Sequence, residues 1–228
     1  MPLDIDIFGQ GIYSPRQAAR LIGTTPQEIL RWTRGSGPND PLWNAYYQGL
    51  DDTVELSFAD LIEVRVVKAF RKASVSLQAI RFAIDFAQRK FDVERPLVTL
   101  EFRTDGTEIL FKALEEDGDY VSLSKNRPGQ RAFAEIIEQS LFDLEYDDGT
   151  AARWRPSNHA EVVIDPQRQF GQPLVDKCGL STAIIFQEFL EFEDIEYLSQ
   201  VYEVPSAVVR AAIRFEQSLE TANGQSTV

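Results

Sequence analysis

The spacing of apolar residues predicts a helix-turn-helix within the first 34 residues. Each of two short segments repeats apolar side chains at helical spacing and so has one face suited to burial. These faces are formed by Ala18, Leu21 and Ile22 in the first segment, and by Ile29 and Leu30 in the second. Gly23 lies between them and suits a tight turn, because glycine adopts positive φ without a steric penalty.

Both predicted helices begin with clear start signals. Ser14-Pro15-Arg16-Gln17 gives an N-cap serine, a proline at the first helical position and a glutamine two residues later. Thr25-Pro26-Gln27-Glu28 repeats this order with a threonine and a glutamate. In each motif the hydroxyl of the first residue can accept a hydrogen bond from the backbone amide of the fourth residue. The side chain of the fourth residue can in turn accept a hydrogen bond from the backbone amide of the first.

Two longer helices are predicted after a loop. Gly35 to Asp52 is rich in Gly, Pro and Asn with embedded aromatic residues, which indicates a wing or loop with aromatic anchors. Ser57 then caps a helix over Phe58 to Lys72, and a second helix covers Leu77 to Phe91. The second carries an apolar stripe that either packs onto the helix-turn-helix or forms a dimer. The stripe consists of Leu77, Ile80, Ile84, Ala87 and Phe91.

From residue 97 the apolar pattern changes to a period of two, which predicts strands. A first hairpin is expected around Thr104-Asp105-Gly106, and a second around Asp147-Asp148-Gly149. A further strand over Tyr120 to Leu123 and a helix over Arg131 to Leu141 are expected between them. The first hairpin pairs Val98 to Phe102 with Glu108 to Phe111, and the second pairs Leu144 to Tyr146 with Ala152 to Arg155.

The last third is predicted to contain a short strand and three helices. The strand covers Val162 to Ile164, and the helices cover Ala183 to Phe192, Asp194 to Tyr202, and Ser206 to Leu219. The chain is thus expected to be α+β and mainly helical. Its expected parts are a winged helix-turn-helix (1–93), a connector with hairpins (94–160), a trihelical domain (161–220) and a disordered tail (221–228).

The charge is unevenly distributed along the chain. The net charge is −13, but residues 1–90 carry 11 basic and 10 acidic side chains, a net of +1. Residues 91–160 and residues 161–228 each have a net charge of −7. Because net negative charge repels phosphate, only the first third is expected to bind nucleic acid.

The composition offers little for catalysis. With a single cysteine, Cys178, and a single histidine, His159, the chain lacks a disulfide framework and the common His-based catalytic and metal sites. The acidic cluster of Glu115, Glu116, Asp117 and Asp119 is interpreted as a solvated turn. The sequence therefore predicts a protein that is not an enzyme and needs no cofactor or metal. The acidic start and the absence of a long apolar run predict a cytoplasmic location away from membranes.

Two stretches resemble known families. Tyr13 to Trp32 resembles the winged helix-turn-helix of MerR-like regulators, and Ile164 to Phe215 is similar to the trihelical domain of VapB-type antitoxins. The second resemblance rests on the order of four features: Gly171-Gln172-Pro173, Gly179-Leu180-Ser181-Thr182, Glu196 to Tyr202, and Ala211-Ala212-Ile213. Many family members have Gly-Thr-Arg where this chain has Gly179-Leu180-Ser181. The resemblance implies a protein that silences a PIN-domain ribonuclease toxin and represses its own operon.

Five residues are the candidates for contact with operator DNA. A recognition helix places its first residues against base edges while neighbouring groups hold phosphates. The candidates are Arg16, Thr25, Gln27, Arg31 and Arg34. Arg31 and Arg34 are suited to guanine or phosphate, and Arg16 to phosphate, although solvated surface arginines would have the same sequence pattern.

Two functions remain open from the sequence. One is the antitoxin, whose acidic part would meet a basic ribonuclease. The other is a stand-alone regulator that senses a small molecule through its middle domain. In either case a homodimer is expected, joined through the trihelical domain or the Leu77–Phe91 stripe, because operators usually mirror a protein two-fold axis.

Overall fold

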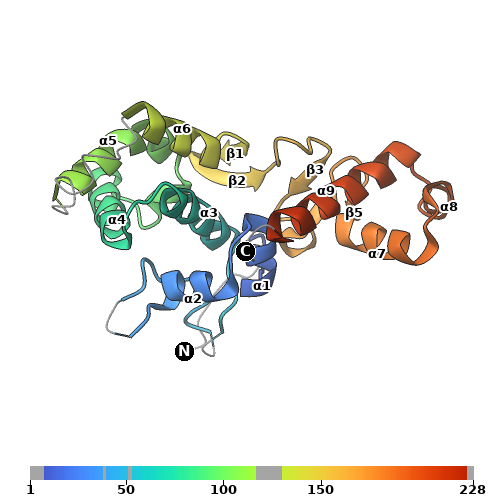
Figure 1. Cartoon of the computed structure of the whole chain (residues 1–228), viewed down its shortest axis with the longest axis horizontal. Helices are drawn as coiled ribbons and strands as arrows, with labels where there is room; N and C mark the ends of the chain where they lie inside the picture. Colours follow the sequence, from blue (N-terminus) through green and yellow to red (C-terminus); the bar gives the residue numbers. More distant parts are fainter. Residues whose placement is uncertain (1–7, 38–39, 51–52, 117–129, 225–228) are drawn as a thin grey trace.

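The computed structural model describes residues 8–37, 40–50, 53–116 and 130–224. The chain forms an elongated molecule with a helical lobe at each end and a β-sheet between them (Figure 1). The fold is α+β and mainly helical, as predicted.

The described helices and strands follow one another in a simple order. The helices of the first lobe are α1 (Pro15–Ile22), α2 (Pro26–Arg34), α3 (Phe58–Lys72), α4 (Leu77–Phe91), η1 (Pro96–Val98), α5 (Leu100–Glu116) and α6 (Gln130–Leu141). The sheet contains β1 (Leu144–Asp147), β2 (Thr150–Trp154), β3 (Val162–Ile164), β4 (Pro173–Val175) and β5 (Leu180–Ser181), with the 3-10 turn η3 (Gln169–Gly171) before β4. The second lobe consists of α7 (Thr182–Phe192), α8 (Ile195–Val201) and α9 (Ser206–Gly224).

The sheet is five-stranded and antiparallel, and its strands keep the order of the sequence. The hairpin expected around Asp147-Asp148-Gly149 is confirmed as β1 and β2, and the strand expected over Val162 to Ile164 is confirmed as β3. The three helices of the last third are also confirmed. Helix α9 continues to Gly224 and so covers residues 221–224 of the expected tail.

The predicted hairpin around Thr104-Asp105-Gly106 is wrong, because these residues lie in helix α5. The buried residues Phe102, Gly106, Ile109 and Leu110 recur at helical spacing, and together they face the lobe interior. The missing side chain at position 106 leaves room for Ile137 of α6 and for Phe102 of the same helix. A Cβ there would lie 3.1 Å from the Cδ1 atom of Ile137. The strand expected over Tyr120 to Leu123 lies outside the described residues.

The apolar stripe of α4 is buried within the chain. Ile80, Ile84 and Ala87 are buried, and Leu77 and Phe91 pack at the edge of the same core. The helix lies mainly against α5 and η1, and only slightly against α3. The prediction that the stripe is buried within the chain is confirmed, but the predicted neighbour is wrong: α4 packs mainly against α5 and η1 and not against the helix-turn-helix.

Each of the two lobes is stabilised by an apolar core of its own. The first runs from Tyr13 to Ile164 and includes residues of α1 to α6 and of β1, β2 and β3, so it crosses the boundary expected at residue 93. The second lies among α7, α8 and α9 around Ile185, Leu198 and Val209. The sheet joins the two lobes (Figure 1).

The N-terminal segment is tied to the turn before β4. The Tyr13 hydroxyl donates to the Gly171 carbonyl at 2.9 Å, and the Ile12 amide donates to the Phe170 carbonyl at 2.9 Å. Tyr13 also pairs with Leu56 just before α3. Burial raises the pKa of Tyr13 above its usual value, so its hydroxyl keeps the proton that it donates. These contacts fix the start of α1 relative to the sheet.

Candidate nucleic-acid interface

Helices α1 and α2 form the helix-turn-helix that the sequence predicts. The Ser14 hydroxyl accepts from the Gln17 amide at 3.3 Å, and the Gln17 side chain accepts from the Ser14 amide at 2.9 Å. Gly23 ends α1 with φ +73° and donates its amide to the Ala19 carbonyl. These contacts fix both ends of α1 by local hydrogen bonds.

The start of α2 differs from the sequence prediction in one contact. The Thr25 hydroxyl accepts from the Glu28 amide at 3.2 Å, as expected. The Glu28 carboxylate, however, accepts from the Thr24 hydroxyl at 2.5 Å and pairs with Lys68 of α3 at 3.4 Å. Burial alone would raise the pKa of Glu28, but the hydrogen bond from Thr24 and the charge of Lys68 lower it below its usual value. Glu28 therefore anchors α2 to α3.

Four of the five candidate DNA-contact residues are exposed. Arg16 lies on the outer side of α1, Thr25 at the cap of α2, and Gln27 and Arg31 one turn apart on α2. Because residues four apart on a helix share a face, Gln27 and Arg31 are presented together. The arrangement exposes one arginine on α1 and one on α2.

Arg34 is placed differently from the other candidates. It is half-buried, and its guanidinium donates to the Thr53 carbonyl at 2.9 Å. This contact joins the end of α2 to the loop that precedes α3. The structure thus gives Arg34 a role in holding the loop.

The loop after α2 is held by aromatic anchors, as the sequence predicts. The Trp43 indole donates to Asp60 at 2.9 Å, and the Tyr47 hydroxyl donates to the Gly11 carbonyl at 2.7 Å. Asp60 also accepts from Arg95 at 2.8 Å, and Arg95 in turn pairs with Glu63 at 2.6 Å. Asp60 and Glu63 are both buried, so this ion-pair cluster fixes the loop against α3.

Helix α9 of the second lobe reaches back to the helix-turn-helix. The buried Glu216 pairs with Arg20 of α1 at 2.6 Å and accepts a short hydrogen bond from the Thr182 hydroxyl at the start of α7. Beside this contact, Phe215 and Leu219 of α9 pack with Leu21 of α1. Figure 1 shows the C-terminal end of α9 next to α1. The two lobes therefore meet at α1.

Arg20, which contacts the second lobe, was not among the residues singled out from the sequence. Arg20 follows Arg16 by one helical turn, so the spacing marked it as a member of the same helix face. Its partner Glu216 is far away in the sequence, and neither residue belongs to a local motif. Only the folded chain reveals that Arg20 is engaged with the second lobe while Arg16 is exposed.

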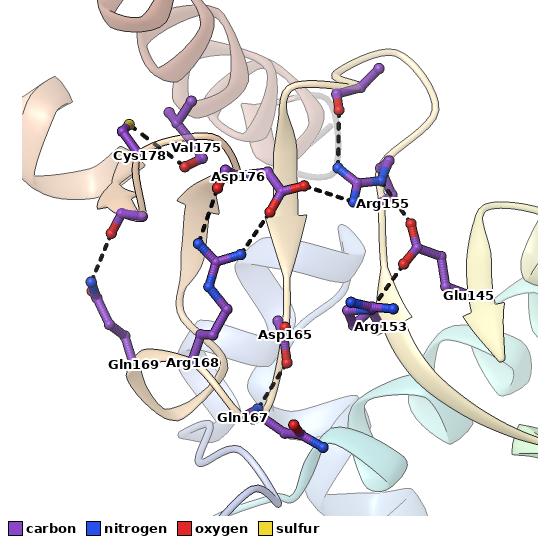
Figure 2. Close-up of polar contacts among 12 residues, drawn as sticks. Glu145, Arg153, Arg155, Asp165, Gln167, Arg168, Gln169, Val175, Asp176 and Cys178 are labelled. Atoms are coloured by element: carbon purple, nitrogen blue, oxygen red, sulfur yellow. Dashed lines mark hydrogen bonds and ion pairs between the residues drawn. The ribbon is translucent and has the colours of Figure 1, made fainter. Parts of the chain in front are cut away.

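An arginine–carboxylate network links strands and turns of the sheet. Figure 2 shows Arg155 between Glu145, at 2.8 Å, and Asp176, at 2.9 Å. Arg168 reaches the same Asp176 at 2.6 Å, and Arg153 pairs with Glu145 at 2.9 Å. Hydrogen bonds from Arg168 and Arg155 hold the pKa of Asp176 below its usual range. Because these arginines already pair with carboxylates, they are poorly suited to binding phosphate.

The residues weighed for chemistry lie in unremarkable surroundings. The His159 ring packs edge-on against Phe215 at 5.4 Å, and Cys178 lies exposed in the turn before β5. In the part of the chain that the structure describes, no three His, Cys, Asp or Glu side chains are grouped as metal ligands would be. Asp117 and Asp119 of the acidic cluster lie outside the described residues. No described helix is long and apolar enough to cross a membrane.

Comparison with known proteins supports one class of function. The structure defines an α+β protein with an N-terminal helix-turn-helix and an acidic trihelical lobe. No family model matches the chain. The chain is 27% identical over 225 residues to the protein named "Putative antitoxin VapB45" of Mycobacterium tuberculosis, and the match covers 90% of this chain and 94% of that protein. This similarity supports a VapB-like antitoxin.

A solved structure shows the same fold. The crystal structure of Rv2018 from Mycobacterium tuberculosis superimposes with a TM-score of 0.69 at 23% sequence identity. The match covers 90% of this chain and 99% of that chain. Both lobes and the sheet therefore belong to one shared arrangement.

Proposed function

We propose that this protein is an antitoxin that binds and neutralises a PIN-domain ribonuclease and represses the operon that encodes the pair. The observation that carries the proposal is the similarity to VapB45 along nearly the whole chain. It favours an antitoxin over a stand-alone regulator that senses a small molecule. The proposal assigns DNA binding to residues 1–93 and toxin binding to residues 161–220, with residues 94–160 joining them.

The charges support this division of labour. Arg16 and Arg31 are exposed on the helix-turn-helix, whereas Thr182 to Leu219 carries two arginines and seven acidic residues. A ribonuclease must attract RNA and so presents basic surface, which an acidic partner complements. The same acidic surface repels DNA. DNA and the ribonuclease are therefore expected to bind different parts of the chain.

The proposal expects a PIN-domain ribonuclease to be encoded beside the gene of this protein, and the two proteins should form a complex. Co-expression of the two chains, with an affinity tag on the ribonuclease only, tests this directly. The expected result is a complex that survives size-exclusion chromatography and contains both chains. Elution of the two proteins as separate peaks would count against the proposal.

We also propose that the antitoxin acts as a homodimer, because one helix-turn-helix covers only a short stretch of DNA and operators usually contain two half-sites. Light scattering at tens of micromolar should then give twice the chain mass of 25.8 kDa. A single-chain mass under these conditions would contradict the dimer.

Arg31→Ala should weaken operator binding by about 1–3 kcal/mol, because the exposed guanidinium lies one turn after Gln27 on the recognition helix. Arg16→Ala should weaken binding to all sequences alike and flatten the salt dependence, since it removes a phosphate contact. Mobility-shift titrations of the upstream promoter fragment at two salt concentrations measure both effects.

Arg210→Ala is the matched control for these variants. It removes one exposed arginine from α9, where the side chain pairs with Glu196 at 3.7 Å, and should leave operator affinity unchanged. Wild-type affinity in the Arg16→Ala/Arg31→Ala double variant would remove the helix-turn-helix from the mechanism.

A further inference from the structure

The second lobe exposes an apolar surface where α7 meets α8. Phe192 and Tyr197 are 47% and 44% exposed, and their rings lie 5.1 Å apart. Val201, one turn after Tyr197 on α8, is 51% exposed. Adjacent exposed apolar side chains of this size are typical of interaction sites. We call these three residues and the carboxylates around them the α7–α8 face.

This face is set on a rigid support. Leu198 of α8 is fully buried against the core of the second lobe, so the neighbouring Tyr197 is held outward. Asp194 caps α8 by accepting from the Tyr197 amide at 2.9 Å. Because the helix is fixed before any partner arrives, little conformational entropy is lost on docking.

The surroundings of the face are strongly acidic. Between Thr182 and Val209 the chain contains six carboxylates and no Lys, Arg or His. The six are Glu188, Glu191, Glu193, Asp194, Glu196 and Glu203. Glu196 is partly neutralised by Arg210 at 3.7 Å and accepts from Ser206 at 2.8 Å, whereas Glu191 and Glu193 are exposed. The face therefore combines an apolar centre with a negative rim.

This combination selects one kind of partner. Nucleic acids and anionic membranes are repelled by the carboxylates. A second copy docked through the same face would place one negative rim against another, because a two-fold interface brings identical residues together. A protein with an apolar patch rimmed by lysines and arginines fits both the centre and the rim.

The position of the face leaves the DNA-binding helices free. Figure 1 shows α8 at one end of the long axis, far from α2 in the other lobe. A partner on α8 would therefore not cover Arg31 or Gln27.

We propose that the α7–α8 face is the docking site for the ribonuclease, with Phe192 and Tyr197 as the apolar anchors and Glu191 and Glu193 as the steering charges. This inference rests on the proposed antitoxin function and assigns its toxin contact to particular residues. Aromatic anchors at the centre of an interface and charged groups at its rim act on different rates, the first on dissociation and the second on association.

The test is a binding titration of the full-length protein with the PIN-domain protein encoded beside its gene. The Phe192→Ala/Tyr197→Ala double variant should bind at least about 30-fold more weakly than wild type. Glu191→Arg should weaken binding about 3- to 10-fold and reduce its dependence on salt. Both changes lie on the surface, so the melting temperature and operator affinity should remain those of the wild type.

Two matched controls lie on the first lobe. Phe142→Ala removes an aromatic ring that is 45% exposed, and Glu138→Arg reverses an exposed charge on α6. Both should bind the ribonuclease like the wild type. If either control weakens binding as much as the α7–α8 variants do, the assignment of the site is overturned.

The outcomes separate this inference from the proposed function. If wild type and the α7–α8 variants bind the ribonuclease equally, the docking site is wrong and the antitoxin function stands. If the wild type fails to bind, the proposed function is wrong and this inference falls with it. If the double variant changes the mass of the free protein by light scattering while ribonuclease binding is unchanged, the face serves self-association and the docking site is again wrong.

Discussion

Gly171→Ala should lower the free energy of unfolding by about 3 kcal/mol or more. Gly171 has φ +82°, and a Cβ there would lie 2.7 Å from the Tyr13 ring carbon that carries the hydroxyl, and closer still to the hydroxyl oxygen. Tyr13 is buried and donates to the Gly171 carbonyl, so its ring has no free space to enter. The substitution must either move Tyr13 or detach the N-terminal segment from the sheet.

Gly23→Ala is the control that separates the steric clash with Tyr13 from the strain of placing alanine at a positive φ. Gly23 has a similar φ of +73° but no neighbouring atom within 4 Å of the added Cβ. The substitution should therefore lower the free energy of unfolding by only about 1 kcal/mol, because only the left-handed backbone conformation is strained. Urea unfolding of both variants measures the difference. Equal losses would show that the Tyr13–Gly171 contact does not hold the segment in place.

Arg95→Ala should lower the free energy of unfolding by about 3–5 kcal/mol, since it leaves the buried Asp60 carboxylate without its cation and the buried Glu63 carboxyl group without its hydrogen-bond donor. Arg95 pairs with Asp60 at 2.8 Å and with Glu63 at 2.6 Å, and both carboxylates are at most 2% exposed. Arg81→Ala is the control: its guanidinium donates to the Asp40 carbonyl near the surface and should contribute only about 1 kcal/mol. Similar losses in the two variants would contradict this account of the cluster.

The same cluster should make stability depend on pH. Burial raises the pKa of Glu63 to about 8, against the opposing charge of Arg95, and the neighbouring Asp60 and Glu94 raise it further. The folded protein then holds a proton that the unfolded chain releases near its ordinary pKa of 4.5, so stability falls as the pH rises from about 4.5 to 8. Glu63→Gln, which does not titrate, should flatten this part of the profile.

Local sequence signals predicted the helix-turn-helix well. The cap residues Ser14 and Thr25 and the turn residue Gly23 act within a few residues of their own position, so their chemistry is visible in the sequence. The same holds for the hairpin around Asp147-Asp148-Gly149. Exposure of Arg16, Gln27 and Arg31 also followed from the apolar faces of the two helices.

Helix α5 was mispredicted because its glycine serves tertiary packing. Thr104-Asp105-Gly106 has the composition of a turn, but Gly106 allows α5 to lie close to Ile137 of α6. The apolar residues of this segment satisfy both a period of two and a helical period over a short range. The neighbouring helix, which the sequence does not reveal, decides between them.

Contacts between segments far apart in the sequence were also beyond sequence analysis. Arg20 of α1 pairs with Glu216 of α9. Within the sheet, Arg155 links Glu145 of the first hairpin to Asp176 after β4. Arg20 and Glu216, like Arg155 and Asp176, come together only in the folded chain. The division of the chain by charge pointed to an acidic partner surface, but the exposed Phe192 and Tyr197 on that surface required the fold.

The inhibition of the ribonuclease itself tests the antitoxin proposal most directly. The PIN-domain protein that the proposal expects beside this gene is purified and given a labelled RNA and increasing amounts of the full-length chain. The account predicts that cleavage falls to background at a modest molar excess, and that the Arg16→Ala/Arg31→Ala variant inhibits as well as the wild type. Undiminished RNA cleavage in the presence of a large excess of the wild-type protein would contradict it.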